Sequence, residues 1–198
     1  MGHVTRPPGR EYPESPPTVL RRREIRDRAL FDLEDGPVTP SNRAELTAVA
    51  RLLNVLVASL VVSSLQFEQH GFLVRAPSHR PVAETLHEYA DRDRHGARLA
   101  AARIRQLGFA AEYDPRDLTA RSRITFRTFA DGDLAGIVTQ GLLGVRILVQ
   151  TLQEAVRWVA DDDPTTRRLL ERLLEEKEAQ AEELSAQSSV KAGTTARP

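Results

Sequence analysis

The chain has 198 residues, which is long enough for one domain with a sizeable core. It carries 28 basic and 28 acidic residues, so no net charge draws the whole protein to nucleic acid or to a membrane surface. The absence of cysteine excludes disulfides, thiolate metal sites and cysteine nucleophiles, and it fits a reducing compartment such as the cytoplasm. No apolar signal-peptide core is present near the N-terminus.

Residues 1–40 are predicted to form an N-terminal extension. Met1–Pro17 is rich in proline, glycine and charge, which predicts disorder, and Thr18–Leu33 predicts a short helix. This helix would carry a basic cluster made of Arg21, Arg22, Arg23, Arg26 and Arg28. Such a cluster could contact DNA phosphates, but Glu24 and Asp27 dilute its charge. A solvated helix face, or a segment docked on another subunit, is the favoured interpretation.

Residues 41–185 are predicted to form four long helices. Apolar residues recur at three- and four-residue steps over Ser41–Leu73, Arg80–Leu107, Asp133–Val159 and Asp163–Ser185. The most apolar run, Leu52–Leu65, is too short to span a membrane and predicts a buried helix. Residues 186–198 are rich in serine, threonine and alanine, which predicts a flexible tail.

The lengths of the connections predict the topology. The first two helices are joined by the short segment 74–79, and the last two by 160–162. The middle connection, 109–131, is long enough to run the length of a helix that spans about 40 Å. Two hairpins joined by one long crossover form an all-α, ferritin-like four-helix bundle.

Several motifs agree with this layout in order and spacing. They are Gly36-Pro37-Val38-Thr39-Pro40, Leu52-Leu53-Asn54, Arg103-Ile104 with Gln106-Leu107-Gly108, and Asp162-Asp163-Pro164-Thr165-Thr166. With them, the region from Gly36 to Leu184 resembles the bacterioferritin and Dps-like branch of the ferritin superfamily. The resemblance implies a di-iron site made of one Glu from each of two helices and a Glu-x-x-His from each of the other two.

Most of the iron ligands that the resemblance implies are absent here. The corresponding positions are Ser59, Asp93, Gly96, Val145, Lys177 and Gln180. Only Asp93 keeps a carboxylate, and neither histidine position holds an imidazole. The site is therefore a degenerate di-iron site. We expect Lys177 to pair with Asp93 across the bundle, so that an ammonium replaces the charge of the metal.

The chain offers few residues for other cofactors. Bacterioferritin-type haem needs a methionine ligand, and the only methionine is Met1, so methionine-ligated haem is not expected. His87, Asp91 and His95 lie at i, i+4 and i+8 on one helix face, which could bind Zn²⁺ or Fe²⁺. A solvated or subunit-facing stripe is the favoured interpretation of this face, so no cofactor is expected, although iron stays possible.

The sequence thus predicts an oligomer or cage subunit in an iron-storage or oxidative-protection setting. It would lack a working ferroxidase centre, serve a structural role, and associate with itself or with an active ferritin-like paralogue. Neither nucleic acid nor membrane is an expected partner. Two alternatives stay open: a ferroxidase that uses a rearranged site of Asp93, His95 and nearby glutamates, and a DNA-binding Dps-like protein that uses the arginine-rich segment.

Overall fold

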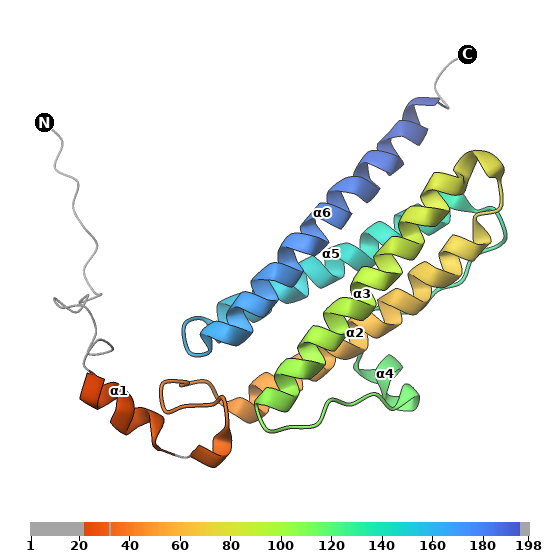
Figure 1. Cartoon of the computed structure of the whole chain (residues 1–198). Coiled ribbons are helices and arrows are strands. Elements are labelled where there is room, and N and C mark those ends of the chain that lie inside the picture. The colour runs from red at the N-terminus through yellow and green to blue at the C-terminus, as the bar shows by residue number, and fades with distance from the viewer. Residues whose placement is uncertain (1–21, 32, 195–198) are drawn as a thin grey trace, which may run out of the picture. The chain divides into compact units, whose positions relative to one another are not determined.

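The computed structural model describes residues 22–31 and 33–194, with side chains described between 23 and 187 in those ranges. By its internal contacts the chain divides into two units, Met1–Ser41 and Asn42–Pro198. In the parts that are described, every regular element is a helix, which confirms the all-α prediction (Figure 1).

The first unit contains one short helix and one 3-10 turn. Helix α1 covers Arg22–Ala29 and the turn η2 covers Leu33–Asp35. Helix α1 ends at Ala29, before the predicted end at Leu33, because its hydrogen bonding stops near Leu30, whose amide bonds back to Arg26. The predicted start at Thr18 lies outside the described residues. The disorder predicted for residues 1–17 lies outside the described residues.

The second unit is a bundle of four long helices. They are α2 (Leu46–Leu73), α3 (Arg80–Gln106), α5 (Leu134–Val159) and α6 (Pro164–Thr194). Helices α2 and α3 form one hairpin through the short turn η3 (Pro77–His79), and α5 and α6 form the other (Figure 1). The crossover between the hairpins contains the short helix α4 (Pro115–Arg121). This is the predicted topology.

Local capping chemistry explains where these helices begin and end. Helix α2 begins at Leu46 rather than at the predicted Ser41, because Glu45 caps it. The Glu45 carboxylate accepts hydrogen bonds from two free backbone amides of the first turn, that of Thr47 at 3.0 Å and that of Ala48 at 2.6 Å. Helix α3 ends before Gly108, which has a φ of 88°. Helix α6 continues to Thr194, beyond the predicted end at Ser185.

Polar side chains of α2 hold the crossover against the bundle. The Asn54 carboxamide oxygen accepts from the Glu112 amide at 2.9 Å, and the Gln66 oxygen accepts from the Arg127 amide at 2.8 Å. His70 Nε2 lies 2.9 Å from the Arg127 carbonyl oxygen. These residues are buried, and they satisfy the backbone of a segment that forms no strand within the described residues.

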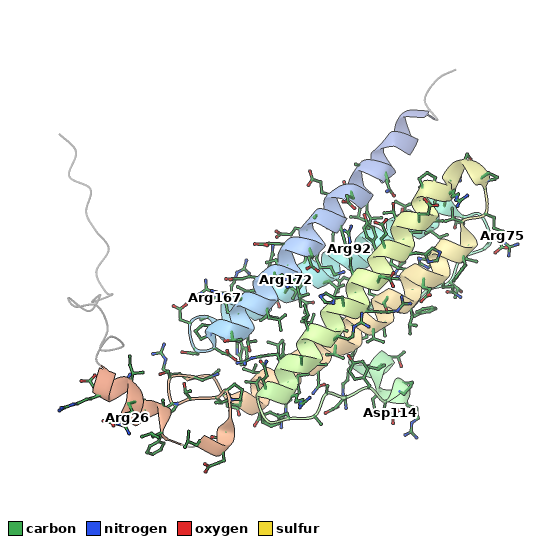
Figure 2. The ribbon with its side chains drawn as sticks, viewed as in Figure 1. Arg26, Arg75, Arg92, Asp114, Arg167 and Arg172 are labelled. Carbon is green, nitrogen blue, oxygen red and sulfur yellow. The ribbon has the colours of Figure 1, made fainter. Side chains whose placement is uncertain are left out.

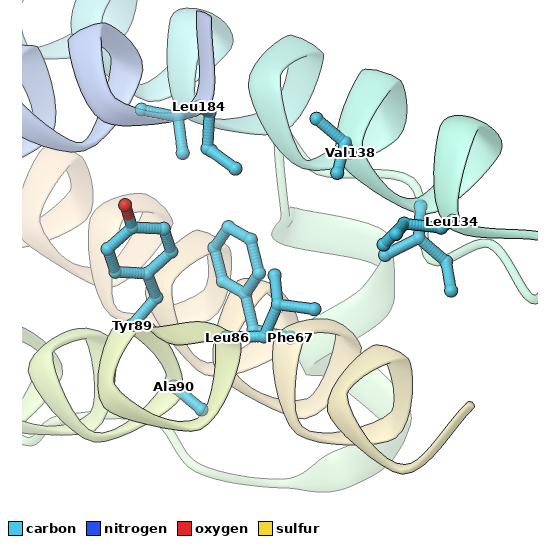
Figure 3. Packing of buried hydrophobic residues seen from close by; sticks show 9 residues of the cluster. Phe67, Leu86, Tyr89, Ala90, Leu134, Val138 and Leu184 are labelled. Atoms are coloured by element: carbon cyan, nitrogen blue, oxygen red, sulfur yellow. The ribbon is translucent and has the colours of Figure 1, made fainter. Parts of the chain in front are cut away.

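Apolar side chains from all four long helices meet at one end of the bundle (Figure 3). Phe67 of α2 and Tyr89 of α3 pack edge to face with ring centroids 5.5 Å apart. Val145 of α5 and Leu184 of α6 close the cluster from the second hairpin. The Tyr89 hydroxyl donates to the carboxylate of Glu183 on α6, so a polar contact also joins the two hairpins. Burial of the hydroxyl group raises the pKa of Tyr89.

Charged side chains lie mainly on the outside of the bundle, as the sticks in Figure 2 show. On α6, Arg167 lies 2.8 Å from Glu171 and Arg172 lies 3.3 Å from Glu176. Exposed pairs of this kind stabilise a helix only weakly, because water and salt screen the charges. These pairs lie at the surface and do not determine the fold.

Two helices, α2 and α5, are long and apolar enough to cross a membrane by length and composition alone. In the structure, 61% of the most apolar window of α2 and 39% of that of α5 are buried inside the protein. Core helices of soluble bundles meet the same two criteria. Leu65 is the exception in the predicted buried run, because its side chain is half exposed.

Candidate functional site

A buried ion pair joins α3 to α6 in the middle of the bundle. The Lys177 ammonium donates to Asp93 Oδ1 and also to Gln180 Oε1, the latter at 2.8 Å. All three residues are at most 2% exposed. The pairing of Lys177 with Asp93 that the sequence predicts is therefore confirmed.

The pair lies in an environment that is poor in other polar groups. Burial raises the pKa of Asp93, and the Lys177 ammonium opposes this shift, as does the hydroxyl of Ser63 on α2. Within the described part of the chain, Asp93 Oδ2 and Gln180 Nε2 make no hydrogen bond. The lysine therefore stabilises a carboxylate that has little other compensation for its lost hydration.

Leucine side chains fill the space beside Gly96. A Cβ atom built at Gly96 would lie 3.0 Å from Leu173 Cδ2 and 3.3 Å from Leu60 Cδ1. Both leucines are fully buried. A histidine at this position could not be accommodated unless these leucines moved, so the position is adapted to close packing of α3 against α2 and α6.

The other two predicted positions lie apart from the ion pair. The Ser59 hydroxyl accepts from the Arg123 amide of the crossover at 2.9 Å and donates to the Val55 carbonyl at 2.8 Å. Val145 belongs to the apolar cluster of Figure 3. The α2 side chain next to Asp93 is instead Ser63, one helical turn beyond Ser59, which sequence reasoning missed. Counting turns from a buried position could have found it, since residues four apart share a helix face.

The side chains assembled here do not fit a di-iron centre. Two iron ions require several carboxylate ligands, together with imidazole, to bind the metals and balance their charge. The site supplies one carboxylate, an ammonium that already bonds to it, an amide and a hydroxyl. An ammonium has no lone pair to donate, and its positive charge repels a cation.

The predicted alternative metal face on α3 does not form a cluster. His87 packs edge to face on Phe72, with ring centroids 4.8 Å apart, and its ring covers Gly71. Asp91 pairs with Arg94 at 2.8 Å, and His95 is exposed. In the described ranges, no three His, Asp or Glu residues are grouped so that they could hold a metal ion.

A second buried ion pair joins the hairpins nearer the start of α6. Arg103 Nη2 of α3 lies 2.8 and 2.9 Å from the two carboxylate oxygens of Asp163, and Arg103 Nε donates to Thr166 at 2.9 Å. Asp163 also accepts from the Thr166 amide at 3.0 Å and so caps the start of α6. Burial acts to raise the pKa of Asp163, but the hydrogen bonds from Thr166 and Arg103 outweigh it and lower that pKa.

The basic cluster is only partly described. Arg23, Arg26 and Arg28 lie on α1 with Glu24 and Asp27 between them, and Arg26 and Arg28 are exposed in its last turn. Arg21 and the side chain of Arg22 lie outside the described residues. A nucleic-acid contact by this segment stays a prediction.

The fold and the buried site define a class: two helical hairpins, one long crossover, and polar residues at the centre of the bundle. Residues 50–190 match the family model of the ferritin-like domain. The chain therefore belongs to the ferritin-like family. No curated protein matches the sequence.

Solved structures share the fold at low sequence identity. The bacterioferritin-related dodecameric thioferritin of Bacteroides fragilis has a TM-score of 0.74 at 20% identity, covering 77% of this chain and 91% of that one. A Dps protein from Bacillus brevis has a TM-score of 0.66 at 24% identity and covers 71% of this chain and 95% of its own. The Vibrio cholerae Dps protein, a ferritin-like diiron-carboxylate protein, has a TM-score of 0.67 at 17% identity, covering 71% and 89%.

Proposed function

We propose that this protein is a structural ferritin-like subunit without a working ferroxidase centre, in an iron-storage or oxidative-protection setting in the cytoplasm. The observation that carries the proposal is the Lys177 ammonium bonded to Asp93, with Gln180 as its second partner. A resident cation at this place takes over the structural role that a metal has in a di-iron bundle. It joins two hairpins and neutralises a buried carboxylate.

Packing around Gly96 supports the same conclusion. A larger side chain at this position, such as that of a metal ligand, would displace Leu60 and Leu173 from their present packing. Ferroxidase chemistry through a rearranged site is less well supported, because Asp93 is buried whereas His95 is exposed, which puts the two on different faces of α3.

Self-association is part of the proposal. Large apolar side chains are exposed on the second unit, namely Leu65, Phe72, Phe109, Tyr113, Phe126, Leu143 and Trp158. Leu65 and Phe72 are seven residues apart on α2 and therefore share a helix face. Exposed apolar groups of this kind favour burial between subunits. The Bacteroides fragilis protein of the same fold is dodecameric. Partners would be further copies of this chain or an active ferritin-like paralogue.

Iron oxidation and native mass spectrometry together test the proposal. We expect wild-type protein to bind no stoichiometric iron and to oxidise Fe²⁺ at the uncatalysed rate, and Asp93→Asn to behave in the same way. Asp91→Asn is the matched control, because Asp91 is an exposed carboxylate two residues away. Stoichiometric iron with rapid oxidation that Asp93→Asn abolishes and Asp91→Asn preserves would instead establish an active ferroxidase. Native mass spectra of protein from its source should contain oligomers, and monomers alone would contradict the assembly.

A further inference from the structure

A groove of about 680 Å³ lies between α2 and α5, away from the buried ion pair. Each helix contributes four residues to it at i, i+3, i+4 and i+7, so two parallel stripes face each other. Ala48 and Ala155 are the small members of these stripes. Their short side chains leave the space between the two helices unfilled.

The walls of the groove combine an aromatic surface with positive charge. Trp158 of α5 forms one wall, and its side chain is 54% exposed. Arg51 of α2 and Arg123 of the crossover also line the groove. The single acidic lining residue, Glu154, already accepts a hydrogen bond from Gln150 Nε2 at 2.7 Å.

The two arginines differ in whether their guanidinium groups already have a charged partner within the protein. Arg51 interacts electrostatically with Glu45, the cap of α2. The guanidinium of Arg123 makes no ion pair or hydrogen bond with any residue the structure describes. Its backbone is held in place, because its amide donates to Ser59 at 2.9 Å and the next residue, Ile124, is buried. The side chain of Arg123 is exposed, and its unpaired guanidinium lines the same groove as the indole ring of Trp158, a combination that suits a planar anion.

We propose that this groove binds a small amphipathic anion with a flat apolar body and a carboxylate, sulfonate or phosphate group. The body would lie against Trp158 and the aliphatic walls, and the anionic group would receive hydrogen bonds from Arg123 and Arg51. The volume lies in the range of small-molecule sites, about 300–1,000 Å³. The site needs no metal and is independent of the proposed loss of ferroxidase chemistry.

Binding in the groove can be followed by tryptophan fluorescence, since Trp158 is the only tryptophan of the chain. The full-length protein would be titrated with 8-anilinonaphthalene-1-sulfonate, a planar aromatic anion, and with the uncharged N-phenyl-1-naphthylamine. We expect saturable quenching of Trp158 emission, energy transfer to the anionic dye, and tighter binding of the anionic than of the neutral dye. Equal affinity for both dyes would overturn the charge assignment.

Three variants complete the test. Arg123→Gln should weaken binding of the anionic dye about threefold to tenfold and leave the neutral dye unaffected. Ala48→Phe should fill the groove from a half-buried position and abolish transfer from Trp158 for both dyes. Arg157→Gln, an exposed arginine beside Trp158 that does not line the groove, is the matched control and should bind like wild type. Dye fluorescence without transfer from Trp158, or an unchanged affinity of Arg123→Gln, would refute the site.

Discussion

Replacing Lys177 with methionine tests whether the buried pair stabilises the bundle. Methionine keeps most of the volume of the lysine stem but leaves Asp93 buried without its cation. Removal of one partner of a buried pair costs about 3–5 kcal/mol, because the other charge stays unpaired. Such a loss is a large share of the total stability of a domain, which is about 5–15 kcal/mol. At about 2–4 °C per kcal/mol, the melting temperature should fall by about 6–20 °C.

The pH dependence of Lys177→Met follows from the position of Asp93. Burial raises the pKa of Asp93, and the substitution removes the ammonium that opposes this shift. A carboxyl with a folded-state pKa above its unfolded value of about 3.9 favours the protonated folded state. The stability deficit of the variant should therefore be smallest near pH 4 and should grow as the pH rises through the folded-state pKa.

Urea unfolding of Lys177→Met, Asp93→Asn and the double variant forms a double-mutant cycle. We expect the double variant to recover most of the stability lost in Lys177→Met, because a neutral amide beside methionine leaves no buried charge. The stability of the double variant relative to wild type should also not rise as the pH falls toward 4, because no buried carboxyl remains to be protonated. The reasoning would be refuted if Lys177→Met lowered the free energy of unfolding by less than about 1 kcal/mol and the two substitutions showed no coupling. That result would mean that water screens the two charges.

Three further predictions concern the contacts that hold the crossover and α6. Burial lowers the pKa of His70, so the neutral imidazole stabilises the fold above about pH 6.5 and this stability is lost as the pH falls. In His70→Gln, the free energy of unfolding measured in urea should therefore depend less on pH between pH 7.5 and 5.5. Asp163→Ala should cost about 3–5 kcal/mol in thermal unfolding, because it leaves Arg103 buried and unpaired and uncaps α6; a loss no larger than that of an exposed pair would contradict this. Ser59→Ala should cost about 1 kcal/mol and increase hydrogen exchange at the Arg123 amide, and unchanged exchange would remove its role as a clamp.

Much of the architecture could be read from the sequence. Apolar periodicity predicted the four long helices, and the lengths of the connections predicted two hairpins and a crossover. The boundaries were less accurate, because the side chain of Glu45 caps α2 after the predicted start and because α6 continues to Thr194. Helix ends depend on single hydrogen bonds, to which periodicity is insensitive.

The central ion pair could also be predicted, because a lysine and an aspartate occupy two of the positions at which the family resemblance implies iron ligands. The surroundings of the pair could not. Ser63, rather than Ser59, lies beside Asp93, because the rotation of α2 about its axis is set by its contacts with the crossover and with α3. The ion pair of Arg103 with Asp163 could not be predicted either, because it depends on the register of α3 against α6.

The sequence by itself thus determined the helical bundle and its topology, and it predicted the loss of most of the iron ligands that the family resemblance implies. Only the tertiary structure decided what takes their place. Leu60 and Leu173 fill the space beside Gly96, Lys177 neutralises Asp93, and the polar residues of α2 serve the crossover. The physical reason is that ligand loss is a property of single positions, whereas packing and charge compensation depend on how neighbouring helices are rotated and aligned.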